Sequence, residues 1–191
     1  MDIRITQTPL PGCFLIRLPE QKDIRGRFVK LFNEDTFRDN GLETAFPEVF
    51  FSVSRKGVLR GLHFQTPPWD HVKLVCCLDG HILDAVVDLR CGSPMYGRFA
   101  TFELSANEAA MLYIPSGMAH GYYVRSETAM VFYQVSKPYA PDHDKGILWC
   151  SAGIPWPSAV PVLSARDELL PALEQFDNPF KFTDQFMDQG G

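Results

Sequence analysis

The sequence lacks the patterns that mark several large classes of protein. It has no run of the roughly 18 to 20 apolar residues that a membrane-spanning helix needs. The first ten residues show no apolar stretch behind a basic start, so we expect no signal peptide and a cytoplasmic location. No block of Lys or Arg stands out, and the formal net charge is −5. This balance argues against nucleic acid and membrane partners, although a few placed arginines suffice for an anionic small molecule.

Motifs for common cofactors and nucleophiles are also missing. The chain has no G-x-G-x-x-G dinucleotide loop, no G-x-x-x-x-G-K-[ST] phosphate loop and no G-x-S-x-G nucleophile turn. Its five cysteines are odd in number and include no C-x-x-C pair, which indicates reduced thiols rather than disulfides. Its five histidines include no H-x-H pair, so the ligand spacing disfavours a metal site.

Apolar and turn-forming residues, in contrast, are plentiful. Hydrophobic residues make up 46% of the 191 positions, which is enough to bury the core of one domain. The aromatic content of 13% favours strands, while 14 glycines and 15 prolines indicate frequent turns. Short apolar segments between turn signals predict an all-β antiparallel sandwich or barrel. The expected strands cover residues 12–18, 27–32, 49–54, 73–78, 81–88, 99–104, 110–114, 118–123 and 128–135.

One turn between these segments carries a specific signal. Asp79-Gly80 is a dipeptide typical of a two-residue hairpin, so we expect segments 73–78 and 81–88 to pair as a hairpin. No internal repeat divides the chain. We therefore predict a single domain over residues 1–178, followed by a polar tail over residues 179–191.

The few helices are expected to be short and mainly C-terminal. One helix of a turn or two begins near Asn33 or Asp35, either of which can cap it, and it ends at Gly41. A second helix begins after Ser164. Asp167 stands three residues after that cap, in the place where a capping box usually has Glu.

Polar side chains interrupt several of the apolar segments, and buried polar groups cost free energy unless they are paired. His63, within Arg60–Gln65, is either a hydrogen-bonded core histidine or part of the wall of a ligand cavity. Each of the other polar side chains is more often structural when it is taken alone. Together they favour a cavity inside the barrel. They are Lys73, Asp84, His120 and Tyr133.

Short motifs follow one another in a definite order from about Asp23 to Pro171. They are Asp23–Gly26, Val58–Gln65, Lys73–Val75, Asp84 with Val87–Arg90, Ser93–Gly97, Ile114–Gly121, Tyr139 with Pro141, Gly146–Trp149, Trp156-Pro157 and Leu163–Asp167. In this order they resemble the dTDP-4-dehydrorhamnose 3,5-epimerases and related nucleotide-sugar epimerases. The resemblance implies a cupin-like jelly roll, a homodimer, and catalysis without a metal or cofactor.

The same resemblance implies roles for individual residues. His63 matches the general base, and Asp167 the carboxylate that orients it. Tyr133 matches the acid on the other face of the sugar, and Lys73 the lysine near the C4 carbonyl oxygen. Six further residues match positions that bind the diphosphate or line the pocket, namely Arg25, Arg60, Gln65, Asp84, His120 and Tyr139.

These residue types suit the implied chemistry, which is proton abstraction next to a ketone. A C4 ketone acidifies the hydrogens on C3 and C5, and an imidazole such as His63 can remove one near neutral pH. The resulting enolate oxygen needs a cation, which Lys73 would supply. The neutral phenol of Tyr133 carries a proton that can be delivered to the opposite face. No cofactor is required, because no electrons are transferred.

Parts of the sequence depart from the family pattern around the expected ligand site. Lys30 stands where the family usually has Glu, Glu48-Val49-Phe50 replaces Gln-Asp-Asn, and His71 replaces Gln. We therefore expect Lys30, Glu48 and His71 to alter ligand recognition, with a nucleotide other than dTDP preferred. The alternative for Lys30 is a solvated strand residue.

The predicted function is inversion of C3, C5 or both in a nucleotide-diphosphate-linked 4-keto-6-deoxyhexose. The expected partners are this substrate and a second copy of the chain. Three alternatives remain open. They are a single-centre epimerase acting on a CDP- or GDP-linked sugar, a non-catalytic sugar-nucleotide-binding cupin, and a metal cupin oxygenase.

Overall fold

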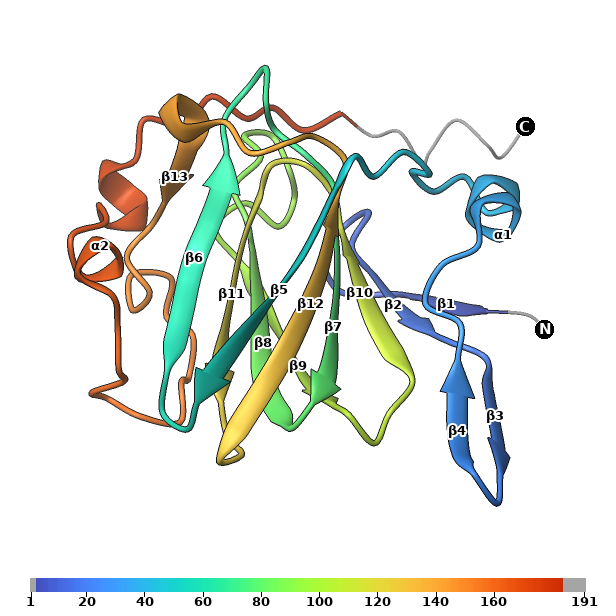
Figure 1. Cartoon of the computed structure of the whole chain (residues 1–191). Helices are drawn as coiled ribbons and strands as arrows, with labels where there is room; N and C mark the ends of the chain where they lie inside the picture. Colours follow the sequence, from blue (N-terminus) through green and yellow to red (C-terminus); the bar gives the residue numbers. More distant parts are fainter. Residues whose placement is uncertain (1–2, 184–191) are drawn as a thin grey trace.

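Strands dominate the structure, in agreement with the predicted all-β class. The computed structural model describes residues 3–183, and most of its strands form two facing sheets (Figure 1). All strand pairs within the sheets are antiparallel. The first sheet has the spatial order β1 (Arg4–Gln7), β2 (Phe14–Arg17), β10 (Ala110–Ile114), β7 (Lys73–Asp79), β12 (Thr128–Val135) and β5 (Glu48–Arg55). The second has the order β13 (Asp144–Gly146), β6 (Leu59–Gln65), β11 (Met118–Val124), β8 (His81–Asp88) and β9 (Phe99–Ser105).

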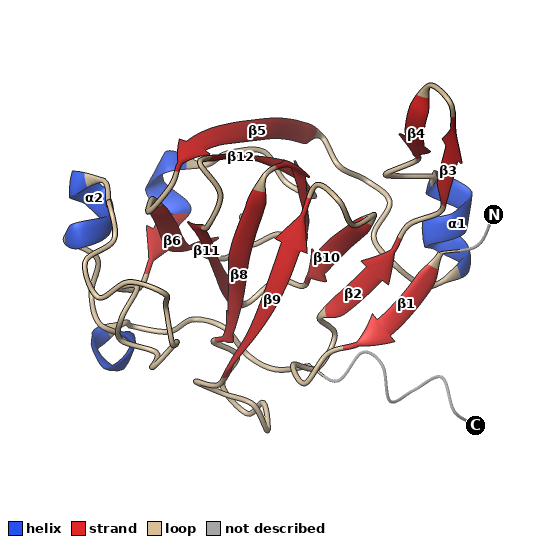
Figure 2. Cartoon of the chain, turned by 90° about the horizontal axis from the view of Figure 1, so that it is seen from below, coloured by secondary structure: helices blue, strands red, loops and turns tan. Residues whose placement is uncertain are grey.

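A separate two-stranded hairpin stands away from both sheets. It consists of β3 (Glu20–Asp23) and β4 (Gly26–Val29). Figures 1 and 2 both show it on the same side of the molecule as helix α1 (Glu34–Asp39), whereas helix α2 (Ala165–Glu168) lies at the opposite side. Two 3₁₀ turns, η1 (Pro141–His143) and η2 (Leu173–Gln175), lie in the C-terminal third.

The core lies between the two sheets because alternate side chains of their strands point inward. Tyr122, Val131 and Tyr133 belong to this central cluster. Two further clusters cover the outer faces. Phe37 of α1 packs over the first sheet, and Phe180 from the C-terminal segment packs over the second. Within residues 3–183, no helix is long and apolar enough to cross a membrane.

Both predicted helix starts are confirmed. Asn33 caps α1, where its Oδ1 accepts a hydrogen bond from the backbone N–H of Thr36 over 3.0 Å. Ser164 caps α2, where its Oγ accepts from the backbone N–H of Asp167 over 3.1 Å. The second cap matters for function, because it sets the position of the Asp167 carboxylate.

The predicted hairpin at Asp79-Gly80 is wrong. The turn is present, but β7 belongs to the first sheet and β8 to the second, so the two strands do not pair. Gly80 has a φ of 80°, and a Cβ there would collide with the backbone oxygen of Thr128. The turn is therefore packed against the β11–β12 connection, and it carries the chain from one sheet to the other.

The C-terminal boundary also differs from the prediction. Residues 179–183 were expected in the polar tail, yet Phe180 is buried and its ring lies 5.5 Å from that of Phe64. The backbone N–H of Cys91 donates to the oxygen of Phe180, and the N–H of Phe182 donates to the oxygen of Cys91. The buried phenyl ring and these backbone hydrogen bonds together hold this segment against the second sheet. Residues 184–191 of the predicted tail lie outside the described part of the chain.

Candidate active site

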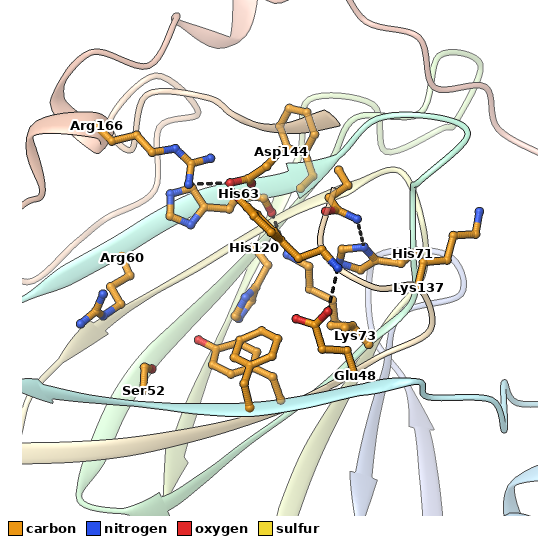
Figure 3. A pocket seen from close by; sticks show the side chains of 16 residues that line it. Glu48, Ser52, Arg60, His63, His71, Lys73, His120, Lys137, Asp144 and Arg166 are labelled. Atoms are coloured by element: carbon orange, nitrogen blue, oxygen red, sulfur yellow. Dashed lines mark hydrogen bonds and ion pairs between the residues drawn. The ribbon is translucent and has the colours of Figure 1, made fainter. Parts of the chain in front are cut away.

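A cavity of about 360 Å³ opens between the two sheets (Figure 3). Strand β6 of the second sheet contributes Arg60 and His63 to its wall. Strand β12 of the first sheet contributes Tyr133 from the facing side. A molecule bound in this cavity therefore contacts groups from both sheets at once.

His63 is paired with a carboxylate from the C-terminal segment. Its Nε2 lies 2.7 Å from Oδ1 of Asp167 in α2. Oδ2 of the same carboxylate accepts from the backbone N–H of Gly61 over 3.3 Å. Burial raises the pKa of Asp167, but the hydrogen bonds from His63 and Gly61 outweigh burial, so its pKa lies below the ordinary value. Because an ionised carboxylate can only accept, Nε2 carries the proton of this hydrogen bond, and in the neutral imidazole the lone pair is on Nδ1.

Two glycines allow the strands that carry the histidines to approach closely. A Cβ on Gly61, whose φ is +128°, would lie 2.6 Å from the Cα of Gly121. A Cβ on Gly121 would lie 2.6 Å from the backbone oxygen of Arg60. This contact sits beside the register shift between β6 and β11, where His63 is paired with His120. The absence of side chains here thus places both imidazoles at the cavity.

Tyr133 lies on the facing side of the cavity, and its ring has an aromatic neighbour. Its ring stacks on that of Phe50, with centroids 4.8 Å apart and an interplanar angle of 16°. Burial raises the pKa of Tyr133 well above its ordinary value, and the negative charge of Asp84 adds to this. A hydrogen bond with Ser52 and the charge of Arg60 act in the opposite direction. The phenol is therefore protonated at neutral pH and able to act as an acid.

Lys73 is the buried cation of the cavity. Its Nζ donates a hydrogen bond to the backbone oxygen of His63 over 3.0 Å. Burial lowers the pKa of Lys73 to about 8, and Arg166 contributes in the same direction, while Asp144 and Asp84 oppose the change. The ammonium form is thus retained at neutral pH but is easily lost above it.

A second imidazole–carboxylate pair lies deeper in the barrel. Nε2 of His120 is 2.8 Å from Oδ2 of Asp84, and the Asp84 side chain is fully buried. Burial raises the pKa of Asp84, partly offset by His120 and Lys73. Its Oδ1 receives no hydrogen bond from the described residues. The His120 ring also meets the ring of Tyr133 edge-on at 6.0 Å, so this pair supports the tyrosine side of the cavity.

The cavity is more cationic than the chain as a whole. Arg60, Lys73, Lys137 and Arg166 line it, against two carboxylates, those of Glu48 and Asp144. Arg166 is held by Asp144 at 2.8 Å. Figure 3 shows Arg60 toward one end of the cavity, and His71 and Lys137 toward the other. Although the net charge of the chain is −5, this site is suited to an anion such as a diphosphate.

Gln65 holds the loops at the rim rather than projecting free polar atoms. Its Nε2 donates to the backbone oxygen of Trp69 and to Nδ1 of His71, and its Oε1 accepts from the backbone N–H of Ala140 over 2.6 Å. Burial, followed by the charge of Lys73, lowers the pKa of His71 to about 3. His71 is therefore neutral, and its Nδ1 lies 3.0 Å from Nε2 of Gln65 and 3.3 Å from the backbone oxygen of Trp69.

The chain matches the family model described as dTDP-4-dehydrorhamnose 3,5-epimerase over residues 7–175. It is 38% identical over 172 residues to the dTDP-4-dehydrorhamnose 3,5-epimerase of Sinorhizobium fredii, which covers 88% of each chain. The chain belongs to the dTDP-4-dehydrorhamnose 3,5-epimerase family. This makes it an isomerase, as its motifs predicted.

Solved structures of this epimerase family share the fold. The dTDP-6-deoxy-D-glucose-3,5-epimerase of Legionella pneumophila, in complex with dTDP-4-keto-L-rhamnose, superimposes with a TM-score of 0.90 at 32% identity, covering 95% of this chain and 100% of that one. A 3'-monoepimerase from Streptomyces bikiniensis, in complex with dTDP-quinovose, gives a TM-score of 0.83 at 31% identity, covering 87% and 86%. The predicted cupin-like fold is confirmed.

Most of the residues predicted for an epimerase site come together in this cavity. Nine of the thirteen line it directly, and Asp167 and Asp84 lie behind the histidines they pair with. The nine are Glu48, Arg60, His63, Gln65, His71, Lys73, His120, Tyr133 and Tyr139.

Arg25 and Lys30 are the exceptions, and neither lines the cavity of its own chain. Arg25 lies in the β3–β4 turn, where it pairs with Asp23, and Lys30 directly follows β4. The physical reason is that this hairpin projects away from the sheets (Figures 1 and 2).

Sequence reasoning missed four polar residues of the cavity, Ser52, Lys137, Asp144 and Arg166. Arg166 precedes Asp167 within the motif Leu163–Asp167, so its place next to a proposed catalytic residue could have indicated it. Ser52 shares a face of β5 with Phe50, which the period of two along a strand also indicates. Lys137 and Asp144 lie outside the quoted motifs.

Proposed function

We propose that this chain inverts C3, C5 or both of a dTDP-linked 4-keto-6-deoxyhexose by proton transfer through an enolate. The single observation that carries the proposal is the arrangement of the base and the acid. The His63–Asp167 pair on the second sheet and Tyr133 on the first line one cationic cavity from opposite sides. Inversion of a carbon needs a base on one face of the sugar and an acid on the other, and this cavity has both.

In the proposed reaction, Nδ1 of His63 takes the proton from the carbon next to the ketone. The C–H bond breaks, its electron pair moves onto the C4 oxygen as an enolate, and Asp167 stabilises the imidazolium. Nζ of Lys73 donates to the backbone oxygen of His63, so its ammonium group lies beside the proposed base. From there it would stabilise the negative charge on the C4 oxygen. The C4 carbonyl then re-forms as the enolate's electron pair takes the proton of Tyr133 on the opposite face of the carbon, and the pair of the broken O–H bond stays on the phenol oxygen. Solvent later removes the proton from His63 and restores the one on Tyr133.

Each of these groups would contribute to the rate enhancement by a known type of catalysis. General acid or base help from one positioned side chain is worth on the order of 10²- to 10⁴-fold. The cation at the enolate acts in a water-poor site, where electrostatic stabilisation is strong. Arg60 and Arg166 would hold the diphosphate, so that binding energy orients the sugar between the two faces.

Deuterium incorporation tests the proposal. Wild-type protein in D₂O should place deuterium at C3, C5 or both of dTDP-4-keto-6-deoxyglucose, as read by NMR. His63→Asn should abolish this exchange while circular dichroism and melting temperature stay close to wild type. Exchange at the normal rate in His63→Asn would contradict the assigned base. Complete absence of exchange in wild-type protein would favour a non-catalytic binding module.

The same NMR experiment separates double from single inversion. Similarity to a 3'-monoepimerase gives a specific reason to consider inversion at one carbon only. Deuterium and changed configuration at C3 alone would identify such an enzyme, whereas both centres would identify a 3,5-epimerase. CDP- and GDP-linked 4-keto sugars belong in the same panel. Glu48 and His71 depart from the family pattern and line the cavity, where they could change which nucleotide is bound.

We also propose that two copies of the chain assemble. Alternate side chains on the outer face of edge strand β5 are apolar and exposed, with Val49 at 51%, Phe51 at 62% and Val53 at 55%. Exposed apolar faces of this kind are characteristic of protein interfaces. Light scattering should give a dimer mass, and Phe51→Glu should lower it.

Assembly would also provide a use for Arg25, which does not reach the cavity of its own chain. If the hairpin serves the partner's cavity, inactive Arg25→Ala and His63→Asn chains should regain activity when co-expressed, because one hybrid site has both native residues. No recovery would mean that Arg25 acts within its own chain or not at all.

A further inference from the structure

The ring of Tyr133 is stacked on the ring of Phe50, a neighbour from the adjacent strand. Phe50 in β5 and Tyr133 in β12 lie directly opposite each other in the antiparallel register. Their ring centroids are 4.8 Å apart and the interplanar angle is 16°. Nearly parallel rings at this separation form an offset stack, which is one of the arrangements that aromatic pairs prefer. The backbone register and the stack together fix the two rings relative to each other.

A second ring bounds Tyr133 from the other sheet. His120 in β11 meets Tyr133 at a centroid distance of 6.0 Å and an angle of 73°, so the two rings are roughly perpendicular. His120 is itself buried and held by Asp84, whose Oδ2 lies 2.8 Å from its Nε2. Tyr133 is therefore restrained from both sheets. Of its two ring neighbours, His120 is buried, whereas Phe50 is 42% exposed.

The packing of the barrel gives little reason for a phenyl ring at position 50. Its neighbours along this face of β5 are the polar residues Glu48 and Ser52, and all three line the cavity (Figure 3). The central core cluster includes Tyr133 but not Phe50. A half-exposed ring buries little apolar area, so it contributes little to the stability of the core. The ring on which Phe50 stacks is that of the acid proposed for the reaction.

The direction of the phenol matters, because an acid must meet one particular carbon of the sugar. The phenol oxygen moves when the Tyr133 ring tilts about its side-chain bonds, and a flat ring against its face limits this movement. A misplacement of about 1 Å in a reacting group can cost on the order of 100-fold in rate. An enolate that the phenol does not meet can take a proton back from His63 on the original face. The starting configuration is then restored, and only exchange with solvent is observed.

We propose that Phe50 is a positioning residue for Tyr133: its stacked ring fixes the direction in which the phenol presents its proton, and so raises the share of enolate that is protonated on the face opposite His63. This inference rests on the proposed function, in which Tyr133 is the acid. The effect of Phe50 falls on the delivery of a proton and not on its removal, because Phe50 lies in the first sheet and His63 in the second.

Phe50→Leu tests the proposal, because it keeps an apolar side chain and removes the flat ring. We expect deuterium exchange at the carbon facing His63 to stay within about 2-fold of wild type, while inverted product falls on the order of 10-fold or more. Phe50→Tyr retains a ring that can stack and should keep both rates within about 2-fold. Tyr96→Leu is the matched control. The Tyr96 ring is exposed to a similar extent, 46%, but does not line the cavity, so both rates should be unchanged.

Phe50→Ile provides an independent variant in case Phe50→Leu folds poorly, since strands favour β-branched residues. It should lower the ratio of inversion to exchange in the same way. A folded variant that loses exchange and inversion equally would overturn the proposal, because Phe50 would then act only as part of the wall of the substrate site. Equal losses of inversion in Phe50→Tyr and Phe50→Leu would also overturn it, because stacking would not be the cause.

Tyr133→Phe, assayed alongside, separates this inference from the proposed function. Adding Phe50→Leu to Tyr133→Phe should cause no further loss of inversion, because no phenol proton remains to be directed. A further loss in this double variant would overturn the positioning role. If Tyr133→Phe loses inversion but Phe50→Leu behaves as wild type, the positioning role is overturned and the acid assignment stands. If Tyr133→Phe inverts its substrate at the wild-type rate, both are overturned.

Discussion

Nε2 of His63 lies 2.7 Å from Oδ1 of Asp167, although 104 residues separate them in the chain. The histidine stands in a central strand of the second sheet, whereas the aspartate is delivered by a short helix in the C-terminal segment. That segment is tied to strand β6 by the hydrogen bond from the N–H of Leu59 to the oxygen of Val162. The proposed base is therefore complete only after the C-terminal segment has docked.

Asp167→Asn should slow deuterium exchange on the order of 10²- to 10⁴-fold. The amide keeps the shape of the carboxylate but no longer stabilises the imidazolium or selects the tautomer with Nδ1 free. Exchange and product formation should fall together, as measured by NMR in D₂O. Glu168→Gln is the control, because it removes the exposed carboxylate of the next residue in the same helix and should leave the rates unchanged. An equal rate loss in Glu168→Gln and Asp167→Asn would contradict the assigned role.

The pH dependence of kcat/KM should reflect the ionisation of Lys73. Because burial lowers the pKa of Lys73 to about 8, its ammonium is present below that pH and is lost as the pH rises through it. Stabilisation of the enolate is lost with it, so kcat/KM should decline above about pH 8. Lys73→Arg stays charged over the whole range and should be slower but show no such decline. A wild-type profile that is flat from pH 7 to 10 would rule out this role.

Arg166→Gln should weaken substrate binding, with KM rising about 10-fold and a smaller change in kcat. The reason is the loss of one charged partner for the diphosphate at the cavity rim. Arg38→Gln is the control, since Arg38 forms only exposed ion pairs within α1. Steady-state kinetics at two salt concentrations should show the wild-type KM rising with salt more than that of the variant. Equal KM values for wild type and Arg166→Gln would exclude Arg166 from binding.

Gly121→Ala should lower the free energy of unfolding by about 1–3 kcal/mol or more, because the new Cβ would lie 2.6 Å from the backbone oxygen of Arg60. Strands β6 and β11 must then separate, which also moves His63 relative to His120. Urea denaturation measures the first effect, and deuterium exchange by the remaining folded protein measures the second. Wild-type stability together with wild-type exchange would show that the close approach has no influence on the site.

Features decided within a few neighbouring residues could be predicted. The strand segments followed from short apolar runs between turns, and the caps at Asn33 and Ser164 from the side chains that accept backbone hydrogen bonds. The motif around His63 indicated a polar cavity in an apolar sheet. The resemblance then supplied Asp167 and Tyr133, which no local pattern would have joined to it.

Relations between distant segments could not be predicted from local sequence and became visible only in the folded chain. Asp79-Gly80 specifies a tight turn, but which strand pairs with β7 depends on the packing of both sheets, so the hairpin prediction was wrong. Arg25 has the residue type of a phosphate ligand, but the direction of the β3–β4 hairpin places it away from its own cavity.

The sequence by itself therefore determined the strands, the caps, the family and the residue types of the chemistry, because each depends on local patterns or on motif order. Only the tertiary structure decided that the hydroxyl of Tyr122 lies between Ser52 and Ser54, and that Ser54 accepts from Arg60. It also decided that four cations meet in a chain of net negative charge. The physical reason is that hydrogen bonds and charge interactions act over a few ångströms in space, whatever the separation along the chain.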